Sequence, residues 1–132
     1  MIKGTTVNST IYSALPDELK SAIVTVNKLS QSHTSLSNLD TTADNMFILS
    51  AFEVFGSTTR GNTTADGTIY PFYQAGNSKI KYLGGTSTAC VHYLRTIYKG
   101  DTDRFFTTVT AAGAEGYLRL TQTGYLAPAF CI

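Results

Sequence analysis

The stretch Cys90-Val91-His92-Tyr93-Leu94-Arg95-Thr96-Ile97 carries the β-branched and aromatic residues that are typical of a strand. Two stretches of the same character follow it, Phe105-Phe106-Thr107-Thr108-Val109-Thr110 and Tyr117-Leu118-Arg119-Leu120. The segment Ala111–Gly116 between them contains two glycines, which provide the permissive backbone that a turn needs. We therefore predict that the second and third strands pair as an antiparallel hairpin.

The closing run Gly124–Ile132 contains a proline at position 128. Proline lacks the backbone N–H that a central strand donates, so Pro128 indicates either an edge position or the start of a strand. The last third of the chain is therefore predicted to be β-structure.

Helical patterns come earlier in the chain. In Leu15–Ile23, apolar residues recur at helical spacing, Pro16 fits the first helical position, and two acidic residues follow it in the first turn. Ser50–Gly56 predicts a helical turn that ends at its glycine. Because helices precede strands rather than alternating with them, we assign the chain to the α+β class.

The remaining segments receive simpler predictions. A β-branched, alternating pattern predicts a strand over Ile23–Leu29, and Met46–Leu49 predicts a short buried strand. Two polar segments, Ser30–Asn45 and Ser57–Gly67, are predicted to be exposed loops. The mixed pattern of Ile69–Leu83 fits either a helix or an extended arm.

Composition excludes several classes of protein. At 132 residues, with no internal repeat, the chain is predicted to be one domain over residues 1–132. The net charge is +1 and charged residues make up 14%, so no basic stripe for nucleic acid is expected. Eight Tyr and seven Phe residues argue against disorder. No apolar run approaches the roughly 18 residues of a membrane span, and no signal peptide is visible, so we expect no membrane insertion.

Two small groups of residues could be interpreted as chemical sites. Cys90 and His92 are two residues apart on a predicted strand and share a face, as a nucleophile and its base would, but no third orienting group is identifiable. Asp101 and Asp103 offer carboxylates to calcium without the further ligands of a calcium loop, so solvated turn residues are the favoured interpretation. Cys90 and Cys131 can form one disulfide, which spacing alone does not decide.

The segment from position 92 to position 122 has a different character. It sets aromatic and charged side chains among small residues, and Tyr and Arg are the residues enriched in recognition surfaces. Composition alone fits an ordinary solvated hairpin equally well. The candidate ligand-binding residues are His92, Tyr93, Tyr98, Lys99, Asp101, Asp103, Arg104, Glu115, Tyr117, Arg119 and Gln122.

Three C-terminal motifs together resemble a known family. Val91–Thr96, then Phe105–Gly113, then Gly124–Ile132 are similar to landmarks of the C-type-lectin-like domains of the formylglycine-generating-enzyme-like branch. Further landmarks upstream extend the resemblance over about residues 11–132, in matching order. Such domains occur at the C-terminal ends of phage and prophage tail proteins and of variable proteins that are diversified by retroelements.

The sequence departs from this family at two places. His92-Tyr93 stands where the family usually has Trp-Trp, and Thr96-Ile97 replaces Ser-Pro. The hairpin carries Asp, Arg, Tyr, Glu and Gln where relatives often carry Asn and Ser. Substitutions concentrated in the hairpin suit a diversified ligand-binding face on a rigid fold.

The resemblance implies a C-type-lectin-like fold and a non-enzymatic binding module. The implied partner is a host-surface protein or a glycan receptor, and the implied location is a virion tail or the surface of a bacterial cell that carries the prophage. No cofactor is expected, because the Glu-Pro-Asn, Gln-Pro-Asp and Trp-Asn-Asp motifs of calcium-dependent sugar binding are absent and Cys90 and Cys131 are too far apart in sequence for the copper-binding pair. Relatives are often trimers, which leaves a homo-oligomer open.

Two alternative functions remain. A structural tail or assembly domain would bury the late hairpin between subunits rather than expose it. An oxidase of the formylglycine-generating type would use Cys90 with His92 or Cys131, although a shared fold does not carry a shared function.

Overall fold

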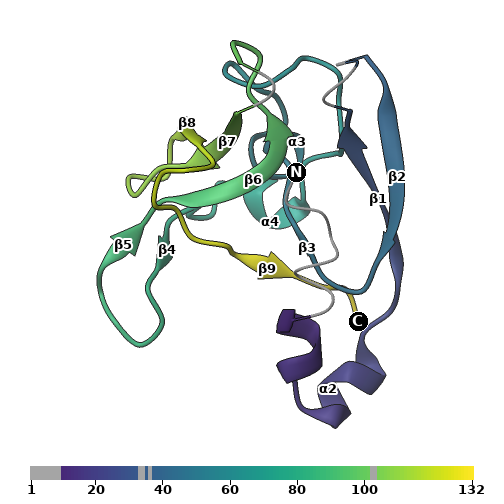
Figure 1. The fold of residues 1–132 in the computed structure, drawn as a ribbon. Coiled ribbons are helices and arrows are strands. Elements are labelled where there is room, and N and C mark those ends of the chain that lie inside the picture. The colour runs from purple at the N-terminus through teal and green to yellow at the C-terminus, as the bar shows by residue number, and fades with distance from the viewer. Residues whose placement is uncertain (1–9, 33–34, 36, 102–103) are drawn as a thin grey trace.

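The chain forms short helices and small antiparallel sheets (Figure 1). The computed structural model describes residues 10–32, 35, 37–101 and 104–132. Within these residues the elements are η2 Tyr12–Ala14, α2 Asp17–Ala22, β1 Val26–Gln31, β2 Leu39–Asp44, β3 Phe47–Ile48, α3 Ala51–Phe55, α4 Pro71–Gln74, β4 Lys81–Tyr82, β5 Ala89–Cys90, β6 His92–Ile97, β7 Phe105–Val109, β8 Glu115–Arg119 and β9 Pro128–Ala129. The mixture of helices and antiparallel sheets confirms the α+β class.

The late hairpin has the predicted form. β7 pairs antiparallel with β8 from Phe105↔Arg119 to Val109↔Glu115, and β6 adds a third strand on the other side of β7. The turn between β7 and β8 closes through Thr110, whose backbone N–H donates to the Ala114 carbonyl at 2.8 Å. Gly113 adopts a φ of 84° in this turn, a left-handed conformation that favours glycine.

Strand β6 is buried along its whole length. Its pairing with β7 shifts register between Tyr93 and Ile97, so the residues between them are free to bond elsewhere. The Arg95 N–H donates to the Leu49 carbonyl at 3.0 Å, and the Ile97 N–H donates to Gln31 Oε1 at 3.2 Å. These hydrogen bonds connect β6 to β1 and to the segment after β3, and both faces of β6 are covered.

The end of the chain returns to the early segments. β9 pairs antiparallel with β3, with Phe47 opposite Ala129, and Val24 forms a bridge with Cys131. Pro128 is the first residue of β9, as its missing N–H predicted. Distant parts of the sequence are thus joined by two very short strands.

The early helices agree with the predictions. α2 lies inside the predicted segment, with Pro16 at the N-cap rather than at the first helical position. α3 begins after Ser50, whose side chain accepts from the Glu53 N–H while the Glu53 carboxylate accepts from the Ser50 N–H. α3 ends at Gly56, which has a φ of 78°.

The prediction of a loop over residues 30–45 is wrong. β2 pairs with β1 over six residues, from Val26↔Asp44 to Gln31↔Leu39, and Figure 1 shows the pair as a long ribbon at the edge of the molecule. The four middle residues of β2 are exposed, so the strand has a polar sequence that resembles a loop. Its stability comes from backbone pairing and from the buried end residues Gln31 and Asp44.

Residues 57–67 form the predicted polar loop, but part of this loop is buried. Asn62 and Asp66 are buried, and Asp66 has no exposed surface. A Cβ atom on Gly67 would lie 2.6 Å from the Glu53 Cγ, so this loop packs directly against the side chain of α3. The mixed segment 69–83 contains both predicted forms, since the short helix α4 is followed by the short strand β4.

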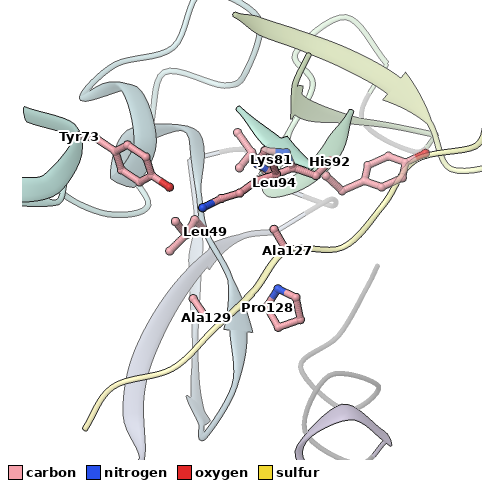
Figure 2. Close-up of a pocket in the computed structure, with 9 residues that line it drawn as sticks. Leu49, Tyr73, Lys81, His92, Leu94, Ala127, Pro128 and Ala129 are labelled. Atoms are coloured by element: carbon pink, nitrogen blue, oxygen red, sulfur yellow. The ribbon is translucent and has the colours of Figure 1, made fainter. Parts of the chain in front are cut away.

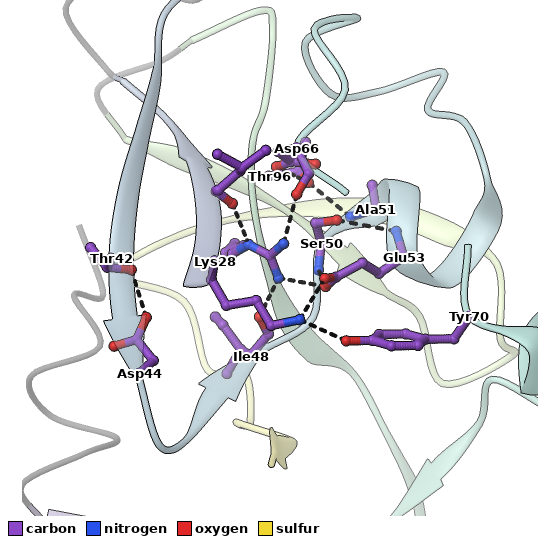
Figure 3. A network of polar contacts seen from close by, with 12 residues as sticks. Lys28, Thr42, Asp44, Ile48, Ser50, Ala51, Glu53, Asp66, Tyr70 and Thr96 are labelled. Carbon is purple, nitrogen blue, oxygen red and sulfur yellow. Dashed lines mark hydrogen bonds and ion pairs between the residues drawn. The ribbon is translucent and has the colours of Figure 1, made fainter. Parts of the chain in front are cut away.

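The buried Arg95 belongs to a polar network, and Figure 3 labels its partners Ile48, Glu53 and Asp66. Its Nε donates to the Leu29 carbonyl at 2.8 Å, and its two terminal nitrogens donate to the Ile48 carbonyl at 2.9 Å and the Asp66 carbonyl at 2.7 Å. One terminal nitrogen also lies 2.5 Å from Glu53 Oε2. The guanidinium therefore ties β6 to β1, to β3 and to the 57–67 loop.

The other oxygen of Glu53 accepts from a second cation. Lys28 Nζ lies 2.9 Å from Glu53 Oε1 and donates to the Tyr70 hydroxyl at 2.6 Å. Burial raises the pKa of Glu53, but the hydrogen bond and charge of Arg95, together with the bonds from Ser50 and Lys28, lower it by more, so the pKa lies below its usual value. The ionised pair thus stabilises the fold above the unfolded pKa of Glu53, and this contribution is lost as the pH falls through the folded value.

Replacing Arg95 with methionine tests the importance of this network. Arg95→Met keeps the bulk of the side chain but leaves the Glu53 carboxylate and three backbone carbonyls without their donor. We expect the free energy of unfolding to fall by about 3 to 5 kcal/mol, the usual cost of breaking a buried ion pair. Urea unfolding followed by circular dichroism measures the change.

Arg104→Met is the matched control. Arg104 is exposed, and its Nε lies 4.0 Å from Asp101 Oδ2. Because an exposed ion pair contributes little, this variant should unfold at the urea concentration of the wild type within error. Equal unfolding midpoints for the two variants would show that the network is not what holds β6.

Candidate functional site

Three aromatic rings gather where β6, β7 and β8 meet at the surface. Tyr98, directly after β6, stacks on Tyr117 of β8 with ring centroids 4.2 Å apart and planes 10° apart. Phe105, the first residue of β7, lies 5.9 Å from each of them. Tyr117 is 40% exposed, so the cluster reaches solvent.

Two exposed arginines flank these rings. The Arg60 Cζ lies 5.4 Å from the centroid of Tyr117, and the Arg119 Cζ lies 5.1 Å from the centroid of Phe105. Such cation–π contacts hold a guanidinium in place while its N–H groups still face water. We call the set Arg60, Tyr98, Phe105, Tyr117 and Arg119 the aromatic face.

Glu115 holds the loop that carries Arg60. Its carboxylate accepts from the Thr58 hydroxyl, from the Thr59 N–H and hydroxyl, each at 2.8 Å, and from the Arg60 N–H at 3.3 Å. Partial burial raises the pKa of Glu115, but the bonds from Thr58 and Thr59 outweigh it and the pKa lies below its usual value. The carboxylate on β8 thus positions a loop more than fifty residues away in sequence.

The structure brings together most of the predicted binding residues. Tyr98, Tyr117 and Arg119 belong to the aromatic face, and Glu115 supports it. Lys99, Arg104 and Gln122 are joined to the same region by hydrogen bonds of their backbone or side chains. The Lys99 N–H donates to the Arg60 carbonyl, the Leu120 N–H donates to the Arg104 carbonyl, and the Gln122 side chain accepts from the Arg119 N–H.

Of the two predicted acidic residues, Asp101 and Asp103, the structure describes only Asp101. Asp101 lies beside Arg104, with 4.0 Å between Oδ2 and Nε. Asp103 lies outside the described residues. Within the part of the chain that the structure describes, no group of three His, Cys, Asp or Glu side chains could hold a metal ion.

His92 and Tyr93 are interior residues, which corrects their assignment to the recognition surface. They are 4% and 5% exposed, because β6 is covered on both faces. Tyr93 holds the backbone of the surface segment from the interior. Its hydroxyl donates to the Arg119 carbonyl at 2.7 Å and to the Gln122 carbonyl at 3.0 Å. It therefore supports, from the interior, the segment that carries Arg119.

The two cysteines are both free thiols. Cys90 is buried, and its Sγ lies 3.5 Å from the Lys81 carbonyl. Cys131 is partly buried and takes part in the bridge with Val24. Among the described residues, no hydrogen bond joins the Cys90 thiol to the His92 ring.

Sequence reasoning missed two members of the aromatic face. Arg60 lies in a loop that was predicted only to be polar, and its contact with Tyr117 depends on the bonds from Glu115. Phe105 was assigned to a strand without a surface role, although its position at the start of β7 places it beside Tyr98. For Arg60, the only signal in the sequence was a positive charge in a Thr-rich loop. For Phe105, the only signal was the pair of adjacent Phe residues in β7.

The fold and the site together define a small α+β domain with an exposed face of stacked tyrosines and arginines. Residues 7–132 match the family that is described as a domain of unknown function (DUF6273), so the chain belongs to that family. Neither the curated proteins nor the solved structures contain a match to the chain. No helix among the described residues is both long enough and apolar enough to cross a membrane.

The buried His92 makes stability depend on pH. Burial, aided by the positive charge of Lys81, lowers the pKa of His92 from 6.5 to about 4. Between these two values the unfolded chain binds a proton that the folded chain does not. The contribution of His92 to the free energy of unfolding is therefore fully present above its pKa in the unfolded chain, and it is lost as the pH drops from about 6.5 toward 4. We expect a loss of about 2 kcal/mol between pH 7 and pH 5, measured by urea unfolding.

His92→Gln is the control for this dependence. Glutamine does not titrate, so the unfolding free energy of the variant should change less than that of the wild type over the same pH range. Proton NMR of the wild type gives a second measurement, in which the His92 ring signal should stay unshifted between pH 7 and pH 5. A His92 ring that titrates near its ordinary value would contradict the prediction.

Proposed function

We propose that this domain is a non-enzymatic receptor-binding module that contacts a protein on a bacterial surface through the aromatic face. It would form the variable ligand-binding domain of a phage tail protein or of a surface-displayed protein that a retroelement diversifies, with a C-type-lectin-like fold. The resemblance of the three C-terminal motifs supports the biological setting. The observation that carries the binding proposal is the Tyr98–Tyr117 stack, with Tyr117 exposed, Arg60 over Tyr117 and Arg119 over the neighbouring Phe105.

The chemistry of the aromatic face suits a binding hot spot. Tyr and Arg dominate the energetics of protein interfaces because they combine large contact area with directional hydrogen bonds. The stack and the cation–π contacts hold the side chains in place before binding, which reduces the entropy lost when a partner docks. A preorganised cluster of this kind needs few additional residues to bind tightly.

The arrangement of the rings favours a protein over a sugar. A sugar stacks on an open ring face, but Tyr98 covers one face of Tyr117 and the Arg60 guanidinium also lies over that ring. The ring edge, the hydroxyl and the arginine N–H groups remain for a partner. These groups match carboxylates and backbone carbonyls of a protein.

The charges around the aromatic face indicate an acidic partner. Arg60, Arg119 and Lys99 are exposed cations, whereas the nearby Glu115 carboxylate is occupied by the 58–60 loop. With Arg104 included, the exposed cations outnumber the Glu115 and Asp101 carboxylates among the described residues, although the whole chain has a net charge of only +1. Such a patch would steer an acidic receptor surface toward the rings.

Cell binding tests the proposal directly. The fluorescently labelled domain is mixed with a panel of intact Gram-negative and Gram-positive bacteria, and binding is measured by flow cytometry. We expect binding to some of the strains, with about a 30-fold loss of affinity in Tyr117→Ala and in Arg60→Ala, the effect of a hot-spot residue. Tyr82→Ala removes a tyrosine that is 57% exposed on β4 and should bind as the wild type does.

Several outcomes would overturn it. Failure of the wild type to bind any strain, or normal binding by Tyr117→Ala, removes the aromatic face as the site. Binding that survives protease treatment of the cells but not periodate treatment identifies a glycan and contradicts a protein receptor. A wild-type oligomer that Tyr117→Ala converts to a folded monomer, shown by light scattering, identifies the face as an assembly interface instead.

Glu115 provides a separate prediction, because it positions Arg60 without facing the partner. Glu115→Ala frees the 58–60 loop and should weaken cell binding about tenfold, as expected for losing hydrogen bonds to a charged group. Glu115→Gln keeps one acceptor oxygen and should retain part of the affinity. Equal affinity of Glu115→Ala and the wild type would show that the loop needs no such support.

A further inference from the structure

A cavity of about 180 Å³ lies between α4, β4, β6 and β9, apart from the aromatic face (Figure 2). Its rim reaches the surface, since Lys81 and Pro128 are exposed. Cavities of about 150 Å³ can hold a benzene molecule, so this one has room for roughly six to eight non-hydrogen atoms. It is lined by Leu49, Tyr73, Lys81, His92, Tyr93, Leu94, Ala127, Pro128 and Ala129.

Polar groups gather at one part of this cavity. Lys81 and Tyr73 both line the cavity, and Figure 2 shows their side chains extending from different elements into the same region. Lys81 is the only charged residue among the nine described lining residues. A second cation is near, since Lys79 Nζ lies 5.8 Å from the Tyr73 ring. The electrostatic potential here is therefore positive, and no lining carboxylate opposes it.

His92 adds an unsatisfied group to the same cavity. It is 96% buried, being 4% exposed, and its Nδ1 has no hydrogen-bond partner in the described part of the chain. A buried polar atom without a partner costs about 1 to 3 kcal/mol. Because its pKa is far below neutrality, the ring is neutral at pH 7 and carries a single N–H. Because His92 lines the cavity, a small ligand that reaches this nitrogen would supply the missing partner.

The rest of the wall is apolar. Leu49, Leu94, Ala127 and Ala129 have aliphatic side chains, and Pro128 of β9 also lines the cavity. A ligand that fits must therefore combine one anionic head with a short apolar tail. The head would accept from Lys81 and Tyr73, and the tail would replace water against the aliphatic side chains.

We propose that this cavity is a binding site for a short-chain monocarboxylate, with Lys81 and Tyr73 as the groups that recognise the carboxylate. Butyrate, with six non-hydrogen atoms, matches the volume and is the probe of choice. The site is independent of the receptor-binding proposal, because none of its lining residues belongs to the aromatic face.

NMR titration of the full chain tests this site. Sodium butyrate is added at constant ionic strength, and the amide and histidine ring signals are followed. We expect saturable shifts centred on Lys81, His92 and Ala129. Butan-1-ol should bind at least tenfold more weakly because it lacks the charge, and butylammonium chloride should not bind.

Two variants assign the recognition to named groups. Lys81→Met alters an exposed side chain and should weaken butyrate binding about tenfold, and Tyr73→Phe, which removes only a hydroxyl, should weaken it several-fold. Lys99→Met removes an exposed lysine beside the aromatic face and should bind butyrate as the wild type does. The proposal fails if butyrate gives no saturable shifts up to 100 mM, if butan-1-ol binds as well, or if Lys81→Met binds normally.

Discussion

The buried Arg95 guanidinium is the interaction on which the remaining structure depends. It donates to three backbone carbonyls from separate segments and pairs with Glu53, whose carboxylate also caps α3. A chain with few regular elements cannot rely on long strand pairing, so one side chain replaces several ladder bonds. The cost of burying the charge is offset because the donors that face the protein are satisfied.

The irregularity of β6 follows from the same requirement. Its register shift against β7 releases the residues around Arg95 toward β1 and the segment after β3, which covers both faces of the strand. The two ends of β6 lie in different surroundings. At one end Tyr98 emerges into the aromatic face, and at the other end His92 is enclosed beside the cavity. The two candidate sites are thus consequences of a single buried strand.

Local pattern predicted the elements whose side chains face a single environment. The β7–β8 hairpin, α2, α3 and the start of β9 each follow from turn glycines, capping residues or proline. The failures share one cause, which is that polar sequences become ordered through distant partners. β2 is exposed yet paired with β1, and Asp66 is polar yet buried beside Thr96. Arg60 joined the site in the same way, through Glu115.

Tyr93 connects the interior to the surface. Its ring lines the cavity, and its hydroxyl holds the Arg119 and Gln122 carbonyls behind the aromatic face. His92 and Tyr93 are adjacent in sequence, and both line the cavity. His92 provides the buried nitrogen that has no partner among the described residues, while Tyr93 keeps the support that the surface needs.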